Sequence, residues 1–332
     1  MDAIASALGA VSLGGPAGHE NLWVFPLMGG NGGPPDYLTL DEALEGGHAR
    51  VTEVSEDGSV PELRFVNESE HRILLLDGEE LVGAKQNRTL NVSIMVGAKQ
   101  TVVVPVTCVE QGRWSYRSPE FQTARHAHFA RARAAKAAQV SESLRSRGSR
   151  EADQDQVWEE ISSRARRMGA VSPTLAMDEI YEKHRRRVES YQRALPAAEG
   201  QAGAVFAIGG QVAGLDLFDS AVTLRKLWPK IVSSYAVDAI DRFEEEDERT
   251  EAPAEAVGAF LQTVARAPVE RFPAIGLGED LRVAAPSLAG GALHVDGRVV
   301  HMAVFSREPA GEEETRGPGR ARMARASRRR SG

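Results

Sequence analysis

Residues 204–218, AVFAIGGQVAGLDLF, decide the fold class, because two apolar runs flank the pair Gly209-Gly210. Two such residues supply the positive φ angles that a tight type I′ turn requires. The stretch therefore predicts an antiparallel hairpin. Residues 292–305, ALHVDGRVVHMAVF, repeat the signal around an Asp-Gly pair, and residues 72–84 do so once more. This turn signal therefore predicts three hairpins.

Outward from these hairpins the composition divides the chain into zones. Residues 10–116 are rich in Val, Leu, Ile and Gly and predict strands, and residues 118–196 are rich in Ala, Arg, Glu and Gln and predict helices. Residues 203–306 mix both, with helices expected over 220–241 and 253–266. Hairpins need sheet partners to be stable. We therefore favour one antiparallel β-rich core, sandwich or barrel-like, with 118–196 as a helical insertion, over two separate β-rich domains. This is the α+β class.

Composition excludes several classes of protein. The chain has 332 residues, of which 42% are apolar and 26% charged, as in a soluble globular protein. Its one cysteine, Cys108, excludes an intramolecular disulfide and a multi-cysteine metal cluster. No apolar run approaches the roughly 20 residues that span a bilayer. The first residues, MDAIASALGA, lack the positive charge of a secretory signal. We expect a cytoplasmic protein with no membrane contact.

Charge is unevenly distributed along the chain. The net charge is −7, but residues 307–332 carry eight Arg against four Glu, which leaves −11 on the rest. An acidic body argues against nucleic-acid binding, which requires a basic face. The C-terminal segment is too polar to bury a core and is expected to be a disordered Arg-rich tail after a single domain at 10–306. Its arginines leave open a non-specific contact with nucleic acid.

The densest polar chemistry lies in residues 77–88, DGEELVGAKQNR. In an extended chain alternate side chains share a face, which would place Lys85 and Asn87 together and Arg88 opposite. Two interpretations stay open. The polar face is either the solvated side of an antiparallel sheet or a groove that binds a ligand.

A second polar cluster follows at residues 108–121, CVEQGRWSYRSPEF. Here a strand is expected to end and a helix to begin, with Ser118 as its N-cap and Pro119 as its first residue. A helix N-terminus beside Arg113 would suit a phosphate or carboxylate. The alternative is an ordinary strand-to-helix corner with Trp114 in the core.

The sequence gives little support for a nucleophilic cysteine or for metal-ligating histidines. Cys108 alternates with valines on one strand face, where a buried thiol is inert. His126, His128 and His184 are expected on helix faces, without a carboxylate or cysteine at metal-ligand spacing. We predict no metal and no cofactor.

The two polar clusters carry a family resemblance. LLLDGEELVGAKQNRTLNVSI at 74–94 and VPVTCVEQGRW at 104–114 resemble a bacterial and archaeal family, the ARG-and-rhodanese-phosphatase-superfamily-associated protein domain, in which ARG is ADP-ribosylglycohydrolase. Residues 209–241 and 290–305 resemble its remainder. The resemblance implies a place in NAD- and ADP-ribose-linked metabolism. The family-like positions in the two clusters are Glu79, Glu80, Lys85, Gln86, Asn87, Arg88, Cys108, Glu110, Gln111, Arg113 and Trp114.

The leading hypothesis is a site for an ADP-ribose-like or other nucleotide-like phosphate compound, with hydrolytic activity. Glu80 or Glu110 would act as general acid or base. The predicted ligand-binding residues are Lys85, Gln86, Asn87, Arg88, Gln111, Arg113 and Trp114, with the arginines on phosphate. The alternative is a non-catalytic sensor or adaptor that binds a partner protein through the helical insertion.

The two clusters are expected to converge. If residues 90–96 and 101–109 form a hairpin, its outer ends bring residues 88 and 110 together. Asn87 or Arg88 should then lie within reach of Glu110 or Arg113, in a concave site.

Overall fold

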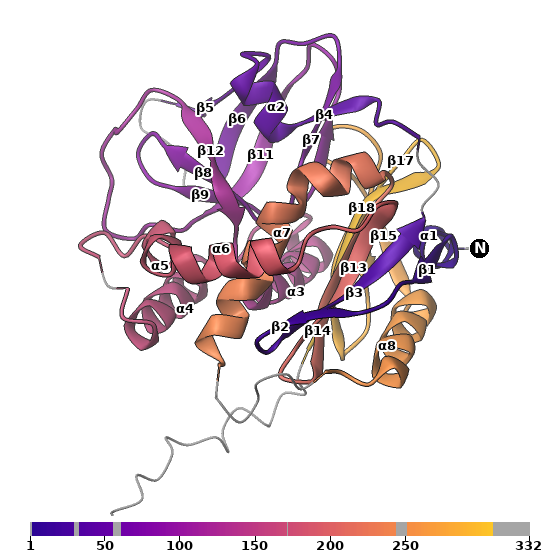
Figure 1. The fold of residues 1–332 in the computed structure, drawn as a ribbon. Coiled ribbons are helices and arrows are strands. Elements are labelled where there is room, and N and C mark those ends of the chain that lie inside the picture. Colours follow the sequence, from indigo (N-terminus) through magenta and orange to yellow (C-terminus); the bar gives the residue numbers. More distant parts are fainter. Residues whose placement is uncertain (1, 30–32, 56–60, 171, 244–250, 308–332) are drawn as a thin grey trace, which may run out of the picture.

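The structure, a computed structural model, describes residues 2–29, 33–55, 61–170, 172–243 and 251–307. In Figure 1 two β-rich parts lie side by side, and helices fill the space between and beside them. The predicted α+β class with an antiparallel β core is confirmed. The predicted tail lies outside the described residues from position 308 on.

The larger β-rich part is a nine-stranded antiparallel sheet that joins the first zone of the chain to the last. Its strands, in spatial order, are β1 (Val11–Leu13), β3 (Leu22–Gly29), β13 (Gln201–Ile208), β14 (Gln211–Phe218), β18 (Arg298–Ser306), β17 (Leu288–Val295), β16 (Glu279–Val283) and β15 (Val269–Pro273), with β2 (Ala17–His19) also on β3. Two of the predicted hairpins are confirmed, because Ile208 pairs with Gln211 and Val295 with Arg298. Gly209 and Gly210 have φ angles of +55° and +76°.

Helices cover both faces of this sheet, so its central strands are buried on both sides. On one face Phe206 stacks on Tyr235 of α7 (Ala221–Asp241), with ring centroids 3.9 Å apart. On the other face the neighbouring Val205 packs in the core formed with α1 (Ala3–Gly9) and α8 (Ala254–Arg266). The helices expected at 220–241 and 253–266 are thereby confirmed.

The second β-rich part contains a six-stranded and a three-stranded sheet. The larger consists of β12 (Phe121–Ala127), β8 (Glu79–Gly83), β9 (Arg88–Leu90), β11 (Thr101–Cys108), β6 (Glu62–Asn67) and β5 (Ala49–Glu53). The smaller consists of β10 (Ile94–Val96), β7 (Arg72–Leu75) and β4 (Tyr37–Thr39), with β4 and β7 parallel. The capped helix α2 (Leu40–Glu45) packs on this part.

Two predicted hairpins in this part are wrong. Residues 72–84 do not fold back on themselves, because β7 pairs with β10 and β4 whereas β8 pairs with β12 and β9. The turn at Gly78, with φ +84°, carries the chain from one sheet to the other. Residues 90–96 likewise divide between two sheets, so β11 pairs with β9 and β6 and not with β10.

The helical insertion starts later than predicted. No helix begins at Ser118: its hydroxyl donates to the Glu120 carbonyl and accepts from the Ala84 amide, which leads the chain into β12 on the edge of β8. The helices that follow are α3 (Ala130–Arg147), α4 (Gln154–Arg167), α5 (Asp178–Lys183) and α6 (Arg185–Ala194). His126 therefore lies on a strand and His128 just after it, before α3 begins, so the expectation of a helix face is wrong for both.

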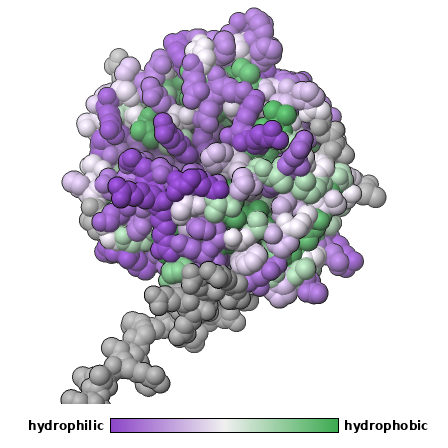
Figure 2. Space-filling model, in the orientation of Figure 1, coloured by the Kyte–Doolittle hydropathy of each residue, from purple (hydrophilic) through white to green (hydrophobic). Residues whose placement is uncertain are grey.

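Helix α7 passes between the two β-rich parts and ties them together. Its Lys230 ammonium lies 2.8 Å from Glu79 of β8 and 2.7 Å from Asp41 of α2. Figure 2 shows hydrophilic side chains gathered over the region of α5 and α6 on the left of the view, which fits a solvated helical face. Among the described residues, no helix is both long and apolar enough to span a membrane.

Candidate functional site

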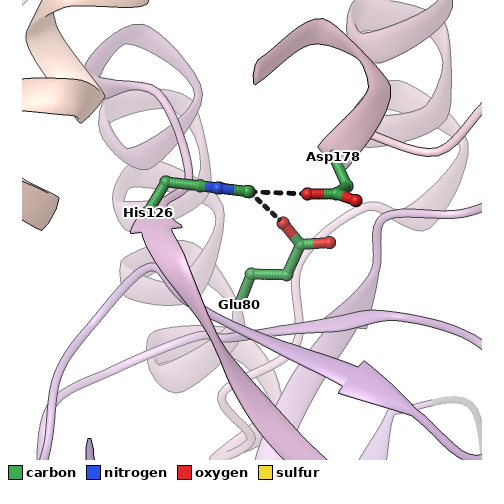
Figure 3. Close-up of side chains that lie close together, drawn as sticks. All are labelled: Glu80, His126 and Asp178. Carbon is green, nitrogen blue, oxygen red and sulfur yellow. Dashed lines mark hydrogen bonds and ion pairs between the residues drawn. The ribbon is translucent and has the colours of Figure 1, made fainter. Parts of the chain in front are cut away.

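Three ionisable side chains from distant parts of the chain meet beside β12. The Glu80 Oε2 atom lies 2.6 Å from His126 Nε2, and the same nitrogen lies 3.7 Å from Asp178 Oδ1 (Figure 3). Glu80 comes from β8, His126 from β12 and Asp178 from the first turn of α5. We call these three residues the Glu–His–Asp cluster.

An irregularity in strand pairing directs His126 toward Glu80. Thr123 pairs with Leu81 and Ala127 with Glu79, so β12 accommodates two more residues than β8 over this interval. Irregularities of this type redirect side chains and are common beside functional sites. The imidazole is also stacked on the Tyr181 ring, at 3.7 Å and 13°. Its position is therefore fixed from two sides.

The segment before α5 positions Asp178. Residue Glu110 forms an antiparallel bridge with Ala176, and the Met177 amide donates to the Val109 carbonyl at 2.9 Å. The Gly112 amide donates to the Thr174 carbonyl at 2.8 Å. The second polar cluster of the sequence thus anchors the segment that carries Asp178.

Burial makes Glu80 unusual for a carboxylate. The side chain is fully buried, and this desolvation raises the pKa of its carboxyl, although the hydrogen bonds from His126 and Asn87 lower it in part. Asn87 donates from Nδ2 to Glu80 Oε1 at 3.1 Å. A buried carboxyl hydrogen-bonded to an imidazole is a typical acid–base arrangement.

Two residues of the cluster, His126 and Asp178, line a pocket of about 460 Å³. Polar and charged groups surround it, including two arginines. The lining residues are Val82, Gly83, Arg117, Ser118, Gln122, Thr123, Ala124, Arg125, His126, Asp178 and Glu182. A concave site with convergent polar groups and a perturbed carboxyl is the expected form of a ligand site.

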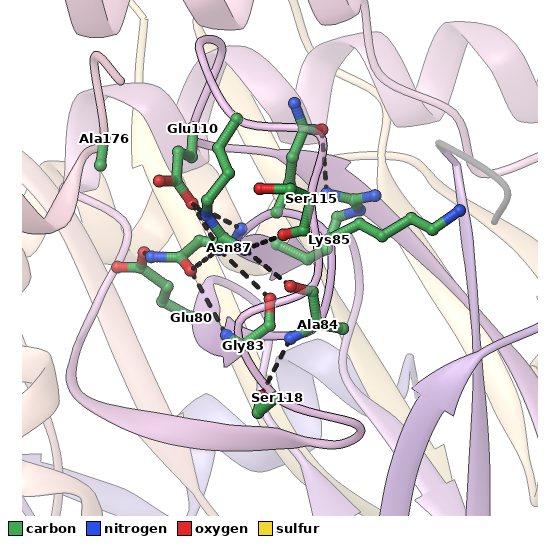
Figure 4. A network of polar contacts seen from close by, with 12 residues as sticks. Glu80, Gly83, Ala84, Lys85, Asn87, Glu110, Ser115, Ser118 and Ala176 are labelled. Atoms are coloured by element: carbon green, nitrogen blue, oxygen red, sulfur yellow. Dashed lines mark hydrogen bonds and ion pairs between the residues drawn. The ribbon is translucent and has the colours of Figure 1, made fainter. Parts of the chain in front are cut away.

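The predicted convergence of the two sequence clusters is confirmed (Figure 4). The Arg113 guanidinium donates to Asn87 Oδ1 at 3.1 Å and lies 2.7 Å from Glu110 Oε2, which also accepts from the Asn87 amide at 3.2 Å. Pairing of Cys108 with Arg88 between β11 and β9 brings these ends together. Asn87 and Glu110 are buried, and the Arg113 side chain is only 12% exposed. The predicted concave site is therefore not at this contact, and the pocket lies beside it along β12.

The Arg113 guanidinium also donates hydrogen bonds to backbone carbonyl oxygens. It donates to the carbonyl oxygens of Gly83, Ala84 and Ser115, at 3.3, 2.6 and 3.0 Å. The guanidinium therefore shapes the loop between β8 and β9, and Asn87 connects that loop to Glu80. Catalysis by Glu80 or Glu110 and phosphate binding by Arg113 stay predictions.

The other predicted ligand residues occupy different environments. Trp114 is 48% exposed and so is not a core residue. The Lys85 ammonium lies 5.3 Å from the Trp114 ring centroid and 5.2 Å from that of Tyr116. Gln111 is exposed. Arg88 is fully buried, donates to Gln86 Oε1 at 3.1 Å and lies 3.9 Å from Glu53, so a phosphate has no direct access to it.

Cys108 is not positioned as a nucleophile. Its side chain is fully buried, and desolvation raises the pKa of the thiol to about 11. Its backbone is held by Gln154, which donates to the Cys108 carbonyl and accepts from its amide, both at 2.8 Å. This fits the interpretation of an inert core thiol.

Comparison with known proteins assigns the chain to a family. No curated protein and no solved structure gives a significant match. Residues 10–305 match the family described as "ARG and Rhodanese-Phosphatase-superfamily-associated Protein domain". This range contains both sequence clusters, the Glu–His–Asp cluster and all but the last residue of the sheets described above. The chain therefore belongs to the ARG and Rhodanese-Phosphatase-superfamily-associated Protein domain family.

Proposed function

We propose that the protein binds a nucleotide-like phosphate compound of the ADP-ribose class in the pocket beside β12 and hydrolyses it. The observation that carries the proposal is that His126 and Asp178 line that pocket, with the buried Glu80 carboxylate hydrogen-bonded to His126. The substrate class rests on the family's description, which records association with ARG, and on the two arginines of the lining.

In this proposal the lining arginines recognise the phosphate and the Glu–His–Asp cluster carries out the reaction. Arg117 and Arg125 are exposed lining residues, and guanidinium groups bind phosphate through paired hydrogen bonds. The Glu–His–Asp cluster would act on water. In hydrolysis the water oxygen bonds to phosphorus or to the anomeric carbon, the bond to the leaving group breaks with its electron pair, and one water proton passes to the cluster.

Calorimetric titration tests the binding step. We expect saturable binding of ADP-ribose or NAD to the wild-type chain in the presence of EDTA. The double variant Arg117→Ala/Arg125→Ala should bind at least tenfold more weakly, because both phosphate donors are lost. Both side chains are exposed, so the fold should be retained.

The matched control is Arg166→Ala, at an exposed position on α4 that does not line the pocket. It should bind as the wild type does. No detectable heat with either compound at millimolar concentration would refute the proposal. An equal loss of binding affinity in the double variant and in the control would refute it as well. Binding without hydrolysis would instead support the sensor alternative.

A further inference from the structure

We infer that the Glu–His–Asp cluster is a binding site for one divalent transition-metal ion. The inference deepens the proposed function, since such an ion would supply the activated water, but it concerns a separate binding event. Glu80, His126 and Asp178 offer one nitrogen and two carboxylate ligands, all with ligand atoms within 4.8 Å of one another.

The distances from His126 to the two carboxylates fit coordination with small shifts. Ligand atoms about 2.1 Å from one metal ion lie roughly 3.0–3.4 Å apart in octahedral or tetrahedral geometry. The His126 nitrogen lies 2.6 Å from Glu80 Oε2 and 3.7 Å from Asp178 Oδ1. Changes of about half an ångström would bring both pairs into this range. The Asp178 side chain, 39% exposed, has room to make that adjustment.

The surroundings supply the second layer that metal sites require. Asn87 holds Glu80 Oε1 by a hydrogen bond, and Tyr181 stacks on the imidazole while its hydroxyl donates to the Ala127 carbonyl at 2.6 Å. Groups of this kind orient ligands and raise metal affinity. The adjoining pocket leaves coordination positions open to water or substrate, as in catalytic rather than structural sites.

The donor set selects the class of ion. An imidazole with two carboxylates suits Zn²⁺, Mn²⁺ or Fe²⁺, whereas Mg²⁺ and Ca²⁺ prefer oxygen ligands alone. The ion would also relieve the cost of burying the Glu80 carboxylate, because it places a positive charge beside it.

The test is titration of the tag-free, EDTA-treated full chain with Zn²⁺ and, separately, with Mn²⁺ followed by electron paramagnetic resonance, with no nucleotide present. We expect one ion per chain with micromolar or tighter affinity for at least one of the two. Asp178→Asn should weaken that affinity at least tenfold. This position is half exposed, so the variant should fold.

Glu179→Gln is the matched control, since it removes the same charge at the next, exposed residue of α5. It should leave the affinity within twofold of the wild-type value. Glu80→Gln gives a second measurement from the buried side of the cluster. The inference is overturned if neither ion binds below about 100 μM, or if Asp178→Asn and Glu179→Gln have equal effects. Nucleotide binding in EDTA is measured separately, so either proposal can fail alone.

Discussion

Replacement of Arg133 by Met is expected to lower the free energy of unfolding by about 3–5 kcal/mol, because it leaves the buried Asp216 carboxylate without its arginine. Arg133 of α3 is fully buried and donates to both oxygens of Asp216, at 3.2 and 2.7 Å. Its Nε atom lies 3.5 Å from Asp77. Burial alone raises the pKa of Asp216, but Arg133 and His301 more than offset this and hold it below its usual range.

Urea denaturation measures this loss, and the same helix provides the control. Arg145 pairs with Glu270 at 2.8 Å, but both side chains are more than one third exposed. Arg145→Met should therefore cost no more than about 1 kcal/mol. If Arg133→Met were as stable as Arg145→Met, the buried Asp77–Arg133–Asp216 network would not hold the two β-rich parts together as the structure indicates.

The His126→Gln variant is expected to reduce turnover of the hydrolysed ADP-ribose-class compound by about 10²–10⁴-fold. Glutamine can still donate a hydrogen bond to Glu80, so the local packing should be retained, but it neither accepts a proton at neutral pH nor serves as a strong metal ligand. The affinity for the compound should change much less than the turnover number.

Steady-state kinetics with product detection by phosphorus nuclear magnetic resonance gives the turnover number, and calorimetric titration gives the affinity for the compound. His184→Gln is the control, because His184 contacts the Met168 carbonyl outside the pocket lining. It should retain near wild-type turnover. Equal turnover in the His126 variant and the wild type would show that the imidazole takes no part in the reaction.

Local patterns in the sequence predict much of the larger sheet. Gly209-Gly210 and Asp296-Gly297 define their hairpins because the turn and both strands are contiguous in the chain. The same signal at Asp77-Gly78 does not give a hairpin, because the turn joins strands of different sheets. Strand β7 pairs with β10 and β8 pairs with β12, which lie later in the chain. Pairing over long sequence separations leaves no local signature.

Some contacts of the candidate site could likewise be predicted from the sequence, and others could not. The meeting of Asn87, Glu110 and Arg113 is predicted from a hairpin of residues 90–96 with 101–109. That hairpin forms only in part, but the pairing of Cys108 with Arg88 still brings these residues together. The contact between Glu80 and His126 could not be predicted, because the two residues are 46 positions apart. In addition, residues 121–127 are expected from the sequence to be helical and in fact form strand β12. Asp178 gave no signal, because its position depends on the bridge between Ala176 and Glu110.

The most direct test of the central claim is electron density from crystals of the wild-type chain soaked with ADP-ribose. We expect the compound beside β12, with phosphate oxygens within hydrogen-bond distance of Arg117 or Arg125 and a reacting bond within about 4 Å of the His126 imidazole or of an ion held there. Density for the compound elsewhere on the chain, with this pocket occupied by water alone, would contradict the account.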